Sequence, residues 1–70
     1  MQKHTAYNIM EQMLLLSEHV DKAGALAEQI DDNDERYAIR KGIAEIAGVV
    51  YTEIMIPIIR QYPELDPDKK

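Results

Sequence analysis

The residues best able to do chemistry in this chain are its histidines, its carboxylates and its single serine. Helical bundles that bind metals use Glu-x-x-His, which places both ligands on one helix face. Neither His4 nor His19 has a glutamate three residues before it. Glu45 and Glu53 lie eight residues apart, too far to form an acid–base pair within one helix. Ser17 is two residues from His19, a spacing that points their side chains apart on a helix. We therefore expect no catalytic residue, cofactor or metal site in a single chain.

An acidic run at Asp31–Glu35 alternates oxygen ligands in the manner of a calcium-binding loop. Arg36 occupies the position that such a loop reserves for glycine, and no bidentate glutamate follows at its twelfth position. The same residues suit a turn between two helices, because Asp32 with Glu35 three positions later matches a capping box. Acidic residues in that first turn also complement the positive end of the helix dipole. We interpret the run as a helix cap.

Basic residues follow this turn, and an RNA-binding hairpin would use Arg36, Arg40, Lys41 and Arg60. In size and in its acidic turn the chain resembles the plasmid copy-number regulators, which are dimeric helical hairpins that bind RNA. The resemblance is architectural and carries no shared motif. With 13 acids and 8 bases the formal charge is -5, which repels phosphate backbones and anionic lipids. Arg36 and Lys41 each have an acidic residue four positions away, so we expect local pairing instead.

Apolar spacing predicts a first helix over about residues 5–30, with Thr5 as its N-cap. Intervals of three and four define its inner seam, which consists of Ala6, Ile9, Met13, Leu16, Val20, Ala23, Ala27 and Ile30. An average spacing near 3.5 favours the shallow packing angle of coiled coils and four-helix bundles. This seam is expected to face a second helix.

The second helix is predicted over about residues 34–61, after an acidic turn at 31–34. One seam is expected to face the first helix, and it consists of Ile39, Ile43, Ile46 and Val50. A second seam gives this helix a wider apolar arc than one partner needs, and it consists of Ala44, Ala47, Tyr51, Ile54 and Ile58. Pro57 lacks a backbone N–H, which predicts a kink or the start of a separate turn. Residues 1–62 thus form one domain, followed by a flexible polar tail at 63–70.

Seventy residues enclose a small core, and a domain of this size usually needs a disulfide, a metal or a partner subunit. The chain has no cysteine, which excludes disulfides and thiolate metal sites. Oligomerisation is the remaining means of stabilisation. The sequence therefore predicts an all-α fold, an antiparallel two-helix hairpin that dimerises into a four-helix bundle through the second seam.

We expect the function of a small non-enzymatic interaction or regulatory protein that acts as a homodimer, with an unidentified protein as a further partner. Two alternatives stay open: an RNA-binding hairpin dimer, and a metal-dependent or hydrolytic activity assembled at the oligomer interface from Glu45, Glu53 or His19 of different subunits. The apolar stretch 46–59 is shorter than the roughly 20 residues of a membrane span. The N-terminus does not lead into a signal peptide. A cytoplasmic location is expected, with neither nucleic acid nor membrane as a partner.

Overall fold

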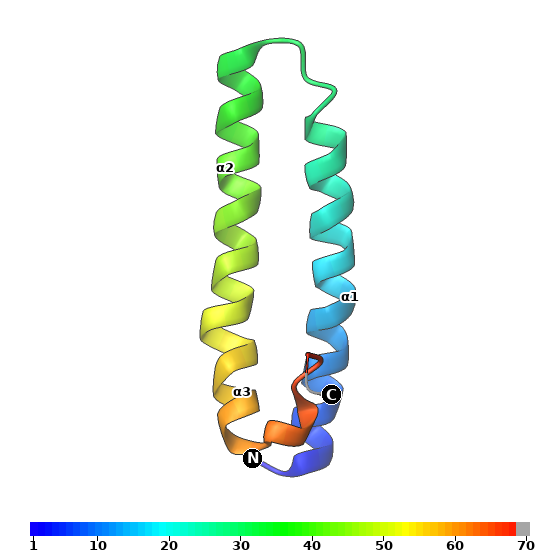
Figure 1. Ribbon diagram of the computed structural model, residues 1–70. Helices are drawn as coiled ribbons and strands as arrows, with labels where there is room; N and C mark the ends of the chain where they lie inside the picture. The colour runs from blue at the N-terminus through cyan, green and yellow to red at the C-terminus, as the bar shows by residue number, and fades with distance from the viewer. Residues whose placement is uncertain (69–70) are drawn as a thin grey trace.

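The computed structural model describes residues 1–68, which form two long antiparallel helices joined by a short turn (Figure 1). The first helix, α1, spans Lys3–Ala27. The second begins with α2 (Asn33–Val49) and continues through a π-helical segment, η1 (Val50–Met55), into α3 (Ile56–Gln61). A 3-10 helix, η2 (Pro63–Leu65), follows. Residues 1–68 contain no strand, so the predicted all-α class and the helical hairpin are confirmed.

The ends of α1 lie two or three residues before the predicted ones. Gln2 is the N-cap residue in place of Thr5, and the Ala6 N–H donates to the Gln2 carbonyl at 3.0 Å. At the other end the N–H groups of residues 28–30 each bond to the carbonyl three residues earlier. Such bonds tighten the last turn into 3-10 geometry. The α-helix therefore ends at Ala27, although the chain keeps turning for three more residues.

The acidic turn caps α2 through a side-chain hydrogen bond. Asp32 is the N-cap residue, and its carboxylate accepts from the Glu35 backbone N–H at 2.8 Å. Asp34 and Glu35 add negative charge at the positive end of the helix dipole. Arg36 closes the turn from the other side, because its guanidinium donates to the Ile30 carbonyl at 2.8 Å. The turn thus satisfies backbone groups at the end of one helix and at the start of the next.

Just before Pro57 the second helix contains a π-helical segment, which has one more residue in its turn than an α-helix has. Proline has no N–H to donate, and the Ile56 N–H bonds to the carbonyl of Tyr51, five residues earlier. The helix then resumes as α3 with the proline in its first turn, where the missing donor is tolerated. We predicted a kink or a new turn at Pro57, and the structure has a π-helical segment followed by a new first turn. Because of the extra residue, the buried position after Val50 is Met55.

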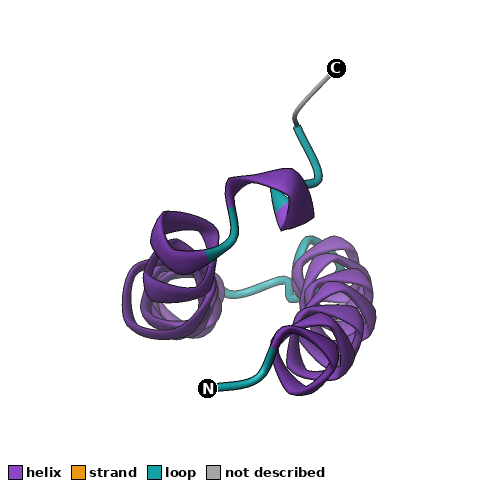
Figure 2. Ribbon diagram, turned by 90° about the horizontal axis from the view of Figure 1, so that it is seen from below, coloured by secondary structure: helices purple, strands orange, loops and turns teal. Residues whose placement is uncertain are grey.

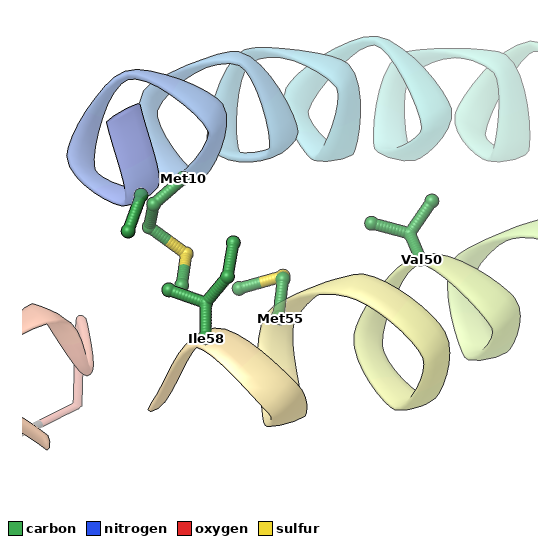
Figure 3. Close-up of a cluster of buried hydrophobic side chains, with 5 residues drawn as sticks. Met10, Val50, Met55 and Ile58 are labelled. Carbon is green, nitrogen blue, oxygen red and sulfur yellow. The ribbon is translucent and has the colours of Figure 1, made fainter. Parts of the chain in front are cut away.

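The core of the hairpin lies at its open end, near the chain termini. Figure 3 shows Met10 of α1 pointing toward Ile58 and Met55, while Val50 reaches toward α1 further along the helix. Ile58 is only 2% exposed. Together with Ala6, these side chains form a continuous buried cluster. Most of the buried side chains of the hairpin therefore lie at this end.

The inner line of α1 follows a heptad pattern that differs from the predicted one. Its buried or half-buried residues recur at intervals of four and three, and they are Ala6, Met10, Met13, Ser17, Val20, Gly24 and Ala27. The predicted seam contained only every second one of these, and its members Ile9, Leu16 and Ala23 are exposed. Toward the turn the inner residues are small. A Cβ built on Gly24 would lie 4.0 Å from Cγ2 of Ile43, so the helices are close there.

The C-terminal segment folds back along the start of α1 (Figure 1). Leu65 of η2 packs against the buried cluster. Lys3 Nζ and Glu64 Oε1 form an ion pair at 2.7 Å, which joins this segment to the first turn of α1. We predicted a flexible tail over residues 63–70. The structure instead places its first part against the helices, and residues 69–70 lie outside the described part of the chain.

The cap at the turn predicts a specific loss of stability. Replacing Asp32→Ala removes the acceptor for the Glu35 N–H, and losing such a cap costs about 1 kcal/mol. Asp31→Ala removes the same charge one residue earlier, outside the cap, and should change stability by less than about 0.5 kcal/mol. Denaturant unfolding at one fixed protein concentration measures both. Equal losses in the two variants would show that charge, and not the cap, is what matters.

Candidate interaction surface

The structure keeps the candidate catalytic groups apart. The Ser17 side chain is partly buried and donates to the Met13 carbonyl at 2.9 Å, whereas His19 is exposed. Glu45 and Glu53 are also exposed. Across residues 1–68 no three His, Asp or Glu side chains lie together as a metal-ligand group. The arrangement of these side chains in one hairpin brings together neither a nucleophile and base nor a ligand set.

The arginines near the turn are engaged in local contacts. Arg36 donates to the carbonyl of Ile30 and to the side-chain oxygen of Asn33. Arg40 Nε lies 3.1 Å from Oε1 of Glu28, so this ion pair joins α2 to the end of α1. These contacts replace the pairing that we predicted for Arg36 with an acid four residues away. Both guanidinium groups serve the hairpin's own structure.

The four bases of the RNA-binding alternative do not form one patch. Arg36, Arg40 and Lys41 line a pocket of about 520 Å³ beside the turn. Arg60 lies in α3, at the opposite end of the hairpin (Figure 1). The hairpin is 46 Å long, and a phosphate backbone would have to follow most of that length to meet all four. Their placement gives no continuous track for a nucleic acid.

Large apolar side chains are unusually frequent on the surface. Six hydrophobic residues are buried in residues 1–68, against twelve large hydrophobic residues that are exposed. The exposed set is Met1, Tyr7, Ile9, Leu14, Leu15, Leu16, Leu26, Tyr37, Ile39, Ile46, Val49 and Tyr51. Single apolar residues are common on monomers, whereas contiguous apolar patches mark interaction sites. The distribution of these residues around the helices therefore decides whether they form a site.

Helix geometry sorts these side chains onto two faces of the hairpin. Successive residues lie about 100° apart around a helix, so the residues before and after an inward position lie on opposite flanks. In antiparallel helices both the chain direction and the inward direction are reversed. Residues that precede inward positions therefore lie on the same face of the hairpin in both helices. Ile9 and Leu16 precede Met10 and Ser17 of the inner line of α1. Val49, the last residue of α2, likewise precedes the buried Val50 of η1.

One face of the hairpin carries only aliphatic side chains among its large apolar residues. This aliphatic face consists of Ile9 and Leu16 of α1 and Ile39, Ile46 and Val49 of α2. Leu26 precedes the inward residue Ala27 but also lies two residues after Gly24, so it points further outward, at the edge of this face. Ile39 and Ile46 belong to it because they lie three residues after Arg36 and Ile43, which point inward. The α2 members are 51%, 54% and 56% exposed. A groove of about 340 Å³ runs among them and is lined by Gly42, Glu45, Ile46, Val49 and Val50.

The opposite face carries tyrosines and the folded-back C-terminal segment. Tyr7 and Leu14 follow inward positions of α1, and they line one groove together with Leu65 and Pro67. Figure 2 shows this segment lying on one side of the two helices. Tyr51 of η1 also follows an inward position, Val50, and lies on this side. We refer to this surface, formed by Tyr7, Leu14, Tyr51 and the folded-back segment, as the tail face.

Hydroxyl groups make the tail face more polar than the aliphatic face. The Tyr7 hydroxyl donates to the Glu11 carboxylate at 3.1 Å. That hydrogen bond, with the negative charge of the carboxylate, raises the pKa of Tyr7 above its ordinary value. Tyr7 therefore stays neutral and engaged at physiological pH.

The structure places the residues of the predicted dimer seam in two different environments. Ile58 is buried in the hairpin's own core, and Ile54 packs against that core half-buried. The remaining members Ala44, Ala47 and Tyr51 are exposed. Ala44 and Tyr51 both follow inward positions, which places this part of the seam on the tail face. The predicted seam is therefore a small surface of two alanines and a tyrosine.

The sequence reasoning also assigned Ile39 and Ile46 to the wrong surroundings. It placed both against the first helix, and they are exposed on the aliphatic face. It did not single out Val49. In the second helix the residues that face α1 are Arg36, Ile43 and Val50, which recur every seven residues. This spacing was the available signal that only one residue per heptad of that helix faces α1.

The second helix is also long and apolar enough to span a membrane. It runs over 29 residues from Asn33 to Gln61, and its apolar stretch is mostly exposed. We judged the stretch 46–59 too short for this, but the continuous helix is longer. Core helices of soluble proteins pass the same criterion, so it is a weak indication.

No family model matches the chain, and neither a curated protein nor a solved structure matches it. The candidate interaction surface therefore rests on the geometry of the hairpin itself.

We expect no measurable affinity for RNA hairpins or duplex DNA at physiological salt. The net charge is -5, Arg36 and Arg40 are engaged at the turn, and Arg60 lies at the far end. Fluorescence anisotropy with labelled oligonucleotides measures this directly. A dissociation constant tighter than about 1 µM that weakens with added salt would contradict the prediction.

Proposed function

We propose that this protein is a non-enzymatic interaction or regulatory protein that acts as a homodimer, in which two hairpins pack into a four-helix bundle. The observation that carries the proposal is the aliphatic face, where five aliphatic side chains are exposed on one side of the hairpin. Large apolar side chains gathered on one side of a protein mark an interaction site, because covering them with a partner is favourable.

The dimensions of the hairpin support this proposal. Its extents are 46 × 21 × 16 Å, so it is a single layer of two helices. Domains are usually built from at least two packed layers around one core. The hairpin's buried cluster lies at the open end, and the half near the turn is held by small residues and polar contacts. A second hairpin supplies the missing layer.

The accessible surface area supports the proposal in magnitude as well. The chain has a mass of 8.0 kDa and exposes 5370 Å². A compact monomer of that mass exposes about 4,450 Å², which leaves an excess of about 900 Å². Each partner in a standard protein–protein interface buries about 800 Å². The excess therefore matches what one hairpin contributes to a stable dimer.

Insertion into a membrane is a second candidate, favoured by the length and hydropathy of the helix from Asn33 to Gln61. Two carboxylates oppose it. Glu45 and Glu53 lie in the apolar half of this helix, and a charged residue at the centre of a membrane helix costs about 2.5–3.5 kcal/mol. In a soluble bundle both side chains remain at the surface, where they are found. A dimer accounts for the apolar and the acidic residues together.

The proposal is tested by light scattering and far-UV circular dichroism over about 1–100 µM protein. We expect twice the chain mass of 8.0 kDa, and helicity that falls with dilution as the dimer dissociates, because the single hairpin has a small core. A monomer that remains fully helical throughout would contradict the proposal. Helicity that instead requires phospholipid vesicles would favour the membrane candidate.

A further inference from the structure

We propose that a second copy of this chain covers the aliphatic face, and that the groove around Gly42 is the centre of the contact. This inference rests on the proposed homodimer and specifies which surface forms it. It moves the contact from the predicted seam of Ala44, Ala47 and Tyr51 to the other side of the hairpin.

The chain itself occupies part of the tail face. Leu65 and Pro67 share a groove with Tyr7 and Leu14, so α1 is partly covered on this side. The Lys3–Glu64 ion pair holds the same segment beside the first turn of α1. A second hairpin laid flat on the tail face would meet this segment before it met the helices. The residues of the aliphatic face lie on the other flank of both helices, and none of them lines the groove that the tail segment occupies.

The chemistry of the two faces also favours the aliphatic face as the contact surface. The five large side chains of the aliphatic face have no polar atoms, so removing them from water leaves no hydrogen-bonding group unsatisfied. On the tail face Tyr51 brings a hydroxyl group that needs a partner when buried, and Tyr7 brings a hydroxyl group that is bonded to the charged carboxylate of Glu11. The α2 part of the predicted seam otherwise offers alanines, which bury little area. The hydrophobic gain is therefore larger on the aliphatic face.

Gly42 gives the aliphatic face its concave centre. A Cβ built on this residue would meet no atom within 4 Å, although glycine in the middle of a helix costs about 1 kcal/mol relative to alanine. Nothing within the hairpin requires the glycine. Ile46 and Val49 rise beside it and bound a groove of about 340 Å³, large enough for a side chain of the partner. In a two-fold dimer the same groove exists on both copies, so each can receive the other's side chain.

Glu45, which also lines the groove, is exposed. It lies two residues after the inward position Ile43, so its carboxylate lies on the outer side of α2. A partner seated on the aliphatic face leaves this carboxylate at the rim, in contact with water. Glu45 therefore stays outside the buried part of the contact. Glu53 lies three residues after Val50, as Ile46 does after Ile43, so its carboxylate marks the end of the aliphatic face on the second helix.

Two substitutions on neighbouring turns of one helix separate the two faces. Ile46→Glu and Ala44→Glu each add one negative charge to an exposed position of α2, the first on the aliphatic face and the second on the tail face. We expect Ile46→Glu to weaken dimerisation by about 30-fold or more, as loss of a central interface residue does. Ala44→Glu should leave the dissociation constant within about 3-fold of the wild type. Sedimentation equilibrium of the full chain measures both.

Thiol labelling gives a second readout that does not depend on breaking the dimer. The chain has no cysteine, so Ile46→Cys and Ala44→Cys each introduce one unique thiol. We expect the thiol at position 46 to react more slowly with maleimide as protein concentration rises, and the thiol at position 44 to react at a constant rate. Concentration-dependent protection at position 44 but not at 46 would overturn the inference.

The outcomes distinguish an error in the choice of face from an error in the proposed homodimer. A dimeric wild type that Ala44→Glu dissociates and Ile46→Glu does not would overturn the choice of face and leave the proposed homodimer standing. A wild type that is monomeric and helical would overturn both. Protection at position 46 that appears only with phosphatidylcholine–phosphatidylglycerol vesicles would show that lipid covers the aliphatic face, and would also overturn the inference.

Discussion

Two helices packed side by side can each bury only one stripe of side chains, and this limit governs where the hairpin places its apolar residues. The second helix has more of them than α1 can cover. Ile43 and Val50 take the inward positions, while Ile39 and Ile46, one turn away from each, are left at the surface. On α1 the inward positions near the turn hold small residues, so little apolar area is buried there. The large aliphatic residues that the two helices cannot bury against each other form the aliphatic face.

The two ends of the hairpin are held by different interactions. At the open end the π-helical segment before Pro57 brings Met55 into the core beside Ile58. The Tyr62 hydroxyl, just after α3, donates to the Met1 carbonyl there. At the turn the contacts are polar, namely the Asp32 cap, the Arg36 hydrogen bonds and the Arg40–Glu28 ion pair. Exposed ion pairs contribute little free energy. These polar contacts therefore stabilise the hairpin less than the buried apolar cluster does.

The sequence determines the hairpin more firmly than its surface. The all-α class and the turn follow from local signals, since Asp32 and Glu35 fix a cap and the acidic run favours a turn over a helix interior. The register does not follow, because intervals of three and four fit two adjacent lines on α1, one through Ile9 and Leu16 and the other through Met10 and Ser17. Both lines are apolar enough to be a core. Only the position of the second helix selects between them, and sequence spacing alone does not contain it.

The position of the tail bears on how far association can proceed. A hairpin with two equally apolar faces could bind a partner on each, and contacts between unlike faces build open chains of molecules. Leu65 and Pro67 cover part of one face, and the hydroxyls of Tyr7 and Tyr51 make it more polar. One face then remains able to pack on itself, and self-complementary contact around a two-fold axis closes after two copies. In the proposed homodimer the folded-back segment would limit association to two copies, so the pairing would depend on the tail face as much as on the aliphatic one.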